Sequence, residues 1–165
     1  MRDASTPSID REALVQALNL VMREASGLGM LYSQAVAQRL GVTTVDIECL
    51  DLVLLRGPVT AGALAEATGL TTGAITGVID RLERAGLARR ERDAEDRRKV
   101  MVRGLPAAVT RGMPLYEPMG RAAMAGLAGY DEAELARFLE FFNRMRDSAK
   151  FALQALRALP TDPPA

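Results

Sequence analysis

The segment from Leu70 to Arg103 constrains the fold of this 165-residue chain more than any other. A threonine, Thr71 or Thr72, can cap a helix at its start, because a hydroxyl accepts a hydrogen bond from a free amide of the first turn. Gly86 can end that helix in a left-handed conformation. Between them, apolar residues recur at three- and four-residue spacing, which predicts one buried helix face. These residues are Ile75, Val78, Ile79 and Leu82.

The opposite face of this predicted helix is small and polar. It carries Thr72, Gly73, Thr76 and Gly77, with Arg81 one turn further along. A glycine inside a helix costs about 1 kcal/mol relative to alanine, so two glycines four residues apart on an exposed face need a reason. Close approach of another surface is one such reason, and the major groove of duplex DNA admits a helix.

The second half of the segment predicts a β-hairpin. Val100 and Val102 alternate with other residues as in a half-buried strand, and residues 87–92 form a more weakly patterned partner. Nine basic and five acidic side chains lie between Arg81 and Arg103, although the whole chain has no net charge. Positive charge is therefore gathered where helix and hairpin meet, as an anionic backbone partner requires. Taken alone, the same pattern is also compatible with an ordinary solvated surface.

Composition excludes several kinds of chemistry. The chain has no histidine and one cysteine, Cys49. Histidine-based catalysis, histidine metal sites, an intrachain disulfide and multi-cysteine metal sites are therefore excluded. No nucleophile elbow or phosphate-binding loop is present, so we expect no enzyme, no metal and no cofactor. No apolar signal segment or membrane span is present, so we expect a cytoplasmic protein without a membrane partner.

A long helix is predicted from Ile9 to about Leu40. Its apolar residues recur at helical spacing, and Gly41 closes it. Gly27 and Gly29 are expected to interrupt or bend it.

Two shorter helices are predicted next. Thr43 and Asp46 fit a capping box at the start of a helix that runs to Leu55 and is apolar on nearly all sides, which is typical of a buried helix. Val59 could add a short strand beside the hairpin, and Thr60 then caps a short helix that a glycine ends. The short helix, the turn and the glycine-faced helix have helix-turn-helix spacing, and the hairpin adds a wing.

The C-terminal third predicts two more helical segments. Pro114 and Pro118 are expected to kink or interrupt the first, over residues 107–128. Asp131 caps the last helix, whose length of roughly 40 Å gives an apolar seam too long for one small domain to cover. The first helix and the same helices of a second subunit would cover it. The seam comprises Leu135, Phe138, Leu139, Phe142, Met145, Ala149, Ala152 and Leu156.

This order of elements resembles the MarR family of transcriptional regulators over nearly the whole chain. The resemblance is most specific over residues 57–66, 70–86 and 90–98. The last of these ranges carries the family's Asp-x-x-Asp-Arg-Arg wing signature at Asp93, Asp96, Arg97 and Arg98.

The resemblance implies a mainly α fold with a small β-wing, made of a winged helix-turn-helix lobe and a helical dimerisation arm. The DNA-binding lobe would span residues 42–106. The dimerisation region would comprise residues 9–41 and 107–160, after a disordered lead over residues 1–8.

The resemblance also implies a sequence-specific, DNA-binding transcriptional regulator that acts as a homodimer on a pseudo-palindromic operator. Arg97 or Arg98 would enter a flanking minor groove, where narrow A·T-rich tracts attract arginine, and Asp96 would orient that arginine. Candidate phosphate contacts, which set register more than sequence, are Thr60, Arg81 and Arg89. The recognition helix would present Thr71, Thr72, Gly73, Thr76 and Arg81.

Many members of the family release DNA when a small, often phenolic or carboxylate ligand binds between the arm and the lobe, which implies a small-molecule effector. Met30, Tyr32 and Cys49 could line such a pocket, or could belong to the core. The family's peroxide sensors carry a reactive cysteine near the start of the first helix, where residues 14–22 here have none. We therefore expect a structural role for Cys49.

A second function class is a winged-helix module that binds a protein and no DNA. The acidic residues Glu91, Glu95 and Asp96 in the wing favour this alternative. Failure to retard any duplex at low salt would distinguish it from a DNA-binding regulator.

Overall fold

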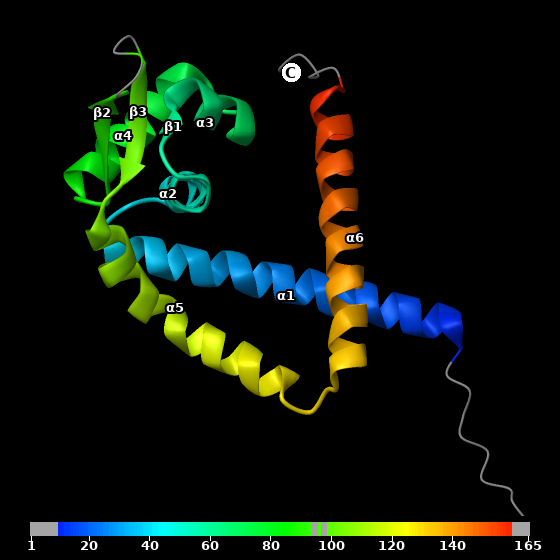
Figure 1. Cartoon of the computed structure of the whole chain (residues 1–165). Coiled ribbons are helices and arrows are strands. Elements are labelled where there is room, and N and C mark those ends of the chain that lie inside the picture. The colour runs from blue at the N-terminus through cyan, green and yellow to red at the C-terminus, as the bar shows by residue number, and fades with distance from the viewer. Residues whose placement is uncertain (1–9, 94–95, 97–98, 160–165) are drawn as a thin grey trace, which may run out of the picture. The chain divides into compact units, whose positions relative to one another are not determined.

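The computed structural model describes residues 10–93, 96 and 99–159. The lead expected over residues 1–8 lies outside these described residues, as do residues 160–165. The chain divides into two compact units, up to Glu117 and from Pro118 onward. The described residues form six helices and one small sheet, as Figure 1 shows, which confirms the mainly α fold with a β-wing.

The first helix, α1, spans Arg11–Leu40 without interruption. Asp10 caps its start, and Gly41 ends it with a φ of 74°. The helix continues through Gly27 and Gly29, because single glycines cost only about 1 kcal/mol each. Only its C-terminal end lies beside the next helix (Figure 1), and the buried residues of α1 are Val36, Ala37 and Leu40.

The second helix, α2, spans Thr44–Arg56 and begins with the predicted capping box. The Thr43 amide donates to Asp46 Oδ2 at 2.8 Å, and the Asp46 amide donates to Thr43 Oγ1 at 3.3 Å. This reciprocal pair satisfies two amides that a helix start leaves without partners.

The helix-turn-helix follows as predicted. Helix α3, Ala61–Thr68, is capped by Thr60 and ends at a glycine in the left-handed region. Helix α4, Thr72–Arg84, is capped by Thr71, whose Oγ1 accepts from the Ala74 amide at 3.2 Å. Of the two threonines considered for this cap, Thr71 therefore makes it.

The wing is a three-stranded antiparallel sheet in the order β1-β3-β2. Strand β1 is Val59–Thr60, β2 is Ala88–Arg92 and β3 is Val100–Gly104. Val102 pairs with Val59 on one side and with Arg90 on the other. The short strand expected at Val59 is thus confirmed.

One apolar core holds the wing against the helices of the lobe. Burying a large aliphatic side chain is worth about 1.5–3 kcal/mol, and this core contains several that are 1% exposed or less. They are Val53, Leu64, Ile75, Val78, Ile79, Leu82, Leu87 and Val102. The predicted apolar face of α4 is thus buried, which leaves the opposite face for another surface.

Of the kink or interruption expected at the two prolines in the C-terminal third, the interruption is wrong. Helix α5 runs continuously over Pro106–Leu127, through both Pro114 and Pro118. Each proline removes a backbone donor, but both residues are exposed, so water can hydrate the carbonyls that lose a partner.

The last helix, α6, spans Glu132–Arg157 and begins with a second capping box. The Asp131 amide donates to Glu134 Oε2 at 2.9 Å, and the Glu134 amide donates to Asp131 Oδ1 at 2.8 Å. None of its residues is buried. Among the described residues, no helix has both the length and the apolar character that crossing a membrane requires.

Candidate nucleic-acid interface

The N-terminal half of α4 presents a small, polar, exposed surface. Thr71, Thr72, Gly73 and Thr76 are all exposed there. A methyl group added at Gly73 would meet no atom within 4 Å, so packing within the chain does not require a glycine at this position. The Thr76 hydroxyl donates to the Thr72 carbonyl at 3.0 Å and keeps its lone pairs as acceptors. The surface predicted from the sequence is therefore present and open to a partner.

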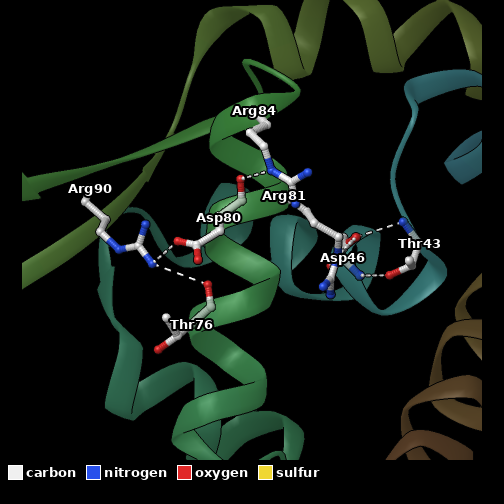
Figure 2. Close-up of polar contacts among 7 residues, drawn as sticks. All are labelled: Thr43, Asp46, Thr76, Asp80, Arg81, Arg84 and Arg90. Atoms are coloured by element: carbon white, nitrogen blue, oxygen red, sulfur yellow. Dashed lines mark hydrogen bonds and ion pairs between the residues drawn. The ribbon is translucent and has the colours of Figure 1, made fainter.

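Arg81, further along α4, has a partner inside the protein. Its Nε donates to Asp46 Oδ1 at 3.1 Å and Oδ2 at 2.9 Å, and its Nη2 donates to Oδ1 at 2.8 Å (Figure 2). The Asp46 side chain is fully buried, whereas that of Arg81 is 37% exposed. This bidentate pair joins α4 to the capped end of α2, and the DNA contact predicted for Arg81 remains a prediction.

Two opposing effects set the pKa of Asp46. Burial would raise it, but the hydrogen bonds from Arg81 and Thr43 outweigh burial and hold the pKa below its ordinary value. Asp46 is therefore ionised at neutral pH. Sequence reasoning recognised its cap but missed its ion pair. Asp46 lies four and seven residues before Leu50 and Val53, on the buried face of α2, and a carboxylate at that spacing is the signal that could have found the ion pair.

Arg90 of β2 connects the wing to α4. Its Nη2 lies 2.7 Å from Asp80 Oδ1 and donates to the Thr76 carbonyl at 3.3 Å (Figure 2). Its Nη1 donates to Glu83 Oε2, and its backbone amide donates to Glu83 Oε1 at 2.7 Å. From the sequence, Arg90 is recognisable only as one more positive charge.

Ion pairs with acidic side chains neutralise much of the positive charge of the wing. Arg89 and Arg103 both pair with Glu91, and the hydrogen bond from Arg103 lowers the pKa of that carboxyl. Among the described basic side chains between Arg81 and Arg103, only those of Arg84 and Arg92 form no ion pair.

The wing tip is described in part. The Asp96 amide donates to Asp93 Oδ1 at 2.8 Å, and Lys99 Nζ lies 3.8 Å from Asp96 Oδ2. Arg97 and Arg98, the predicted minor-groove arginines, lie outside the described residues, so the orienting role of Asp96 remains a prediction. At the other end of the sheet, Thr60 Oγ1 accepts from the Ala63 amide at 3.1 Å, and its phosphate contact is likewise untested.

The three candidate pocket residues have different surroundings. Cys49 is fully buried, and burial, reinforced by the negative charges of Asp46 and Glu48, raises the pKa of its thiol to about 11. The Tyr32 hydroxyl donates to the Leu115 carbonyl at 2.6 Å. Only Met30 lines a cavity of about 620 Å³ between α1 and α2. That cavity is lined by Gly27, Gly29, Met30, Leu31, Ser33, Gln34, Thr44 and Glu48.

No cluster of three or more acidic or cysteine side chains suited to a metal ion occurs among the described residues.

Comparison with known proteins identifies the family. The sequence pattern of the MarR family matches residues 40–99. The uncharacterized HTH-type transcriptional regulator YcgE of Bacillus subtilis (strain 168) is 34% identical over 147 residues, which cover 89% of this chain and 96% of that protein. The chain belongs to the MarR family. It is a transcriptional regulator of that family.

Solved structures of MarR regulators share the fold. A MarR family protein from Bacillus stearothermophilus matches with a TM-score of 0.66 and 21% identity, over 86% of this chain and 99% of that one. A MepR mutant from S. aureus bound to an oligodeoxyribonucleotide matches with a TM-score of 0.56 and 16% identity, over 80% and 97% of the two chains. At these identities the similarity establishes the MarR fold alone.

Proposed function

We propose that this MarR regulator binds duplex DNA in a sequence-specific manner through the lobe spanning residues 42–106. The exposed threonine and glycine surface at the start of α4 is the observation that supports this most directly. Thr71, Thr72, Gly73 and Thr76 would enter the major groove, where threonine hydroxyls and methyl groups read base edges. Gly73 would let the helix backbone approach the bases closely.

The wing would occupy the adjacent minor groove. The side chain that enters this groove would be that of Arg97 or Arg98, and Asp96 would orient it. A narrow minor groove concentrates negative potential and favours arginine. Phosphate contacts from Thr60, Arg81 and Arg89 would then set the register of the lobe on the duplex.

We propose that the regulator acts as a homodimer through residues 9–41 and 107–160. Within the first unit, α1 exposes a series of large apolar side chains, and within the second unit α6 does the same. Apolar surface of this extent on a monomer marks an interaction site. A two-fold dimer presents two recognition helices to half-sites about one helical turn apart. The exposed residues include Leu14, Leu18, Val21, Leu139, Phe142 and Leu156.

A small-molecule effector is the second element of the proposal. The cavity between α1 and α2 has a volume within the range of about 300–1,000 Å³ that small ligands occupy. Ser33, Gln34 and Glu48 supply polar groups beside the apolar side chain of Met30. The effector would release DNA only if its affinity differs between the DNA-bound and free forms of the dimer. We propose a cytoplasmic location, since the proposed partner is DNA. We assign no catalytic role to any residue.

A gel-shift experiment tests the proposal. Wild type is expected to retard a selected duplex with strong salt dependence, because phosphate contacts release counterions. The Arg97→Ala/Arg98→Ala variant should lose most of this affinity while its size-exclusion profile stays unchanged. Unaltered affinity would remove the wing from the interface. Failure of wild type to retard any duplex at low salt would favour the protein-binding alternative.

A further inference from the structure

The guanidinium of Arg90 contacts one stripe of the recognition helix. Its three acceptors, on Thr76, Asp80 and Glu83, are four and three residues apart, which places them along one side of α4. The backbone amide of Arg90 binds the same Glu83 carboxylate. Strand β2 is thus fixed to α4 by both a side chain and the main chain.

The charges around Arg90 disfavour contact with a phosphate. Two carboxylates, Asp80 and Glu83, surround one guanidinium, so the cluster carries one more negative charge than positive. Both terminal nitrogens of the guanidinium, Nη1 and Nη2, contact acceptors of the protein, and the side chain is 31% exposed. A phosphate approaching this cluster would be repelled, although the strand around it is rich in arginine.

We propose that Arg90 is a positioning residue that holds the wing and the recognition helix at one fixed angle, and that it does not contact DNA. This inference rests on the proposed DNA-binding function. The 13-residue helix α4 is about 20 Å long, so a tilt of a few degrees moves one end by more than an ångström relative to the other. Without the Arg90 contacts, the helix and the wing would fit their two grooves together less well.

The test compares two duplexes by fluorescence anisotropy over a series of salt concentrations. One duplex is selected by wild type from a random pool, and the other is a scrambled duplex of the same composition. Arg90→Gln should weaken binding to the selected duplex by about tenfold or more, the scale of one misread base pair. Affinity for the scrambled duplex and the slope of log Kd against log salt should stay as in wild type.

Arg90→Lys separates positioning from phosphate binding in a variant that keeps the charge. Lysine cannot span both carboxylates with a planar fork, so Arg90→Lys should lose specificity as Arg90→Gln does. In an Asp80→Asn/Glu83→Gln background, Arg90→Gln should change affinity little further, because the groups through which it acts are gone. Arg92→Gln, two residues along the same strand, is the matched control for loss of an arginine that forms no ion pair within the described residues.

The inference is overturned if Arg90→Gln weakens both duplexes by the same factor and reduces the salt slope by about one, which is the signature of a lost phosphate contact. Wild-type behaviour of Arg90→Lys, or full additivity in the Asp80→Asn/Glu83→Gln background, would overturn it as well. Those outcomes leave wild-type DNA binding intact. If wild type selects no duplex at all, the proposed function fails, and the inference fails with it.

Discussion

Arg81 and Asp46 form a bidentate ion pair whose carboxylate is fully buried, 35 residues apart in the sequence. The same carboxylate accepts from the Thr43 amide at 2.8 Å. One side chain therefore closes the start of α2 and fixes the last turn of α4. The orientation of α4 depends on this junction as well as on the apolar core beneath it.

Replacement of Asp46 by asparagine should destabilise the lobe by about 2 kcal/mol at pH 7, because it removes the charge that compensates Arg81 and disturbs the cap. Arg81 is partly exposed, so water can hydrate it and the loss stays below that of a fully buried pair. Urea unfolding measures the difference. Glu91→Gln, which removes the two surface ion pairs with Arg89 and Arg103, is the control and should leave the midpoint unchanged. An Asp46→Asn midpoint equal to that of the control would contradict the role of the pair.

The stability difference between wild type and Asp46→Asn should depend on pH. The pKa of Asp46 is lowered by folding, so the unfolded chain takes up the proton first. The contribution of Asp46 is then complete above its unfolded pKa of about 3.9 and is lost as the pH falls through the lower folded pKa. Unfolding curves at pH 7, 5, 4 and 3 should show a constant difference down to about pH 5 that narrows below about pH 4. A difference that widens in acid would contradict this.

Gly73→Ala tests the close approach of DNA to the recognition helix. The new methyl group would meet no atom of the protein within 4 Å, so stability should stay the same or rise by up to about 1 kcal/mol. Affinity for a selected duplex should nevertheless fall. Gly112→Ala in α5, where an added methyl group is equally clear of neighbours, is the matched control and should leave affinity unchanged. Equal affinities of the two variants would argue against close approach at Gly73.

Cys49 should behave as a structural residue. Its thiol is buried, and its pKa is raised to about 11, so almost no thiolate is present at pH 8. A chromogenic disulfide reagent at pH 8 should leave the native protein unlabelled and should titrate one thiol in guanidinium chloride. Rapid labelling of the native protein would indicate an accessible, reactive cysteine instead.

The exposed apolar seam of α6 should hold the dimer together. Phe142 is 64% exposed on this helix, and Phe142→Glu would place a charge where a second subunit is proposed to pack. Light scattering after size exclusion should report a dimer for wild type and a monomer for this variant. Lys150→Glu, on the same helix but outside the seam, should remain a dimer. Dimeric Phe142→Glu would place the interface elsewhere.

Local features of the fold could be predicted from the sequence because their causes lie within a few residues. The capping boxes at Thr43 and Asp131, the glycine that closes α1 and the buried stripe of α4 are all of this kind. The exposed polar face of α4 followed directly from that stripe, since the two faces of an amphipathic helix are complementary.

Features that depend on packing between distant segments could not be predicted. The partners of Arg81 and Arg90 were missed, because pairing across a lobe depends on how α2, α4 and β2 pack. The continuity of α5 was missed because two prolines were judged by their missing donors alone, without the exposure that lets water compensate. The grouping of Met30 with Tyr32 and Cys49 came from family resemblance, and of these three residues only Met30 lines the cavity between α1 and α2.

Selection of duplexes from a random pool by the wild-type protein, followed by sequencing, tests DNA recognition by a symmetric pair of α4 helices most directly. We expect enrichment of one inverted repeat whose half-site centres are separated by about 10 base pairs, one helical turn, because two-fold related recognition helices read one face of the duplex. No enrichment at low salt, or enrichment of a single half-site without its inverted copy, would contradict this mode of binding.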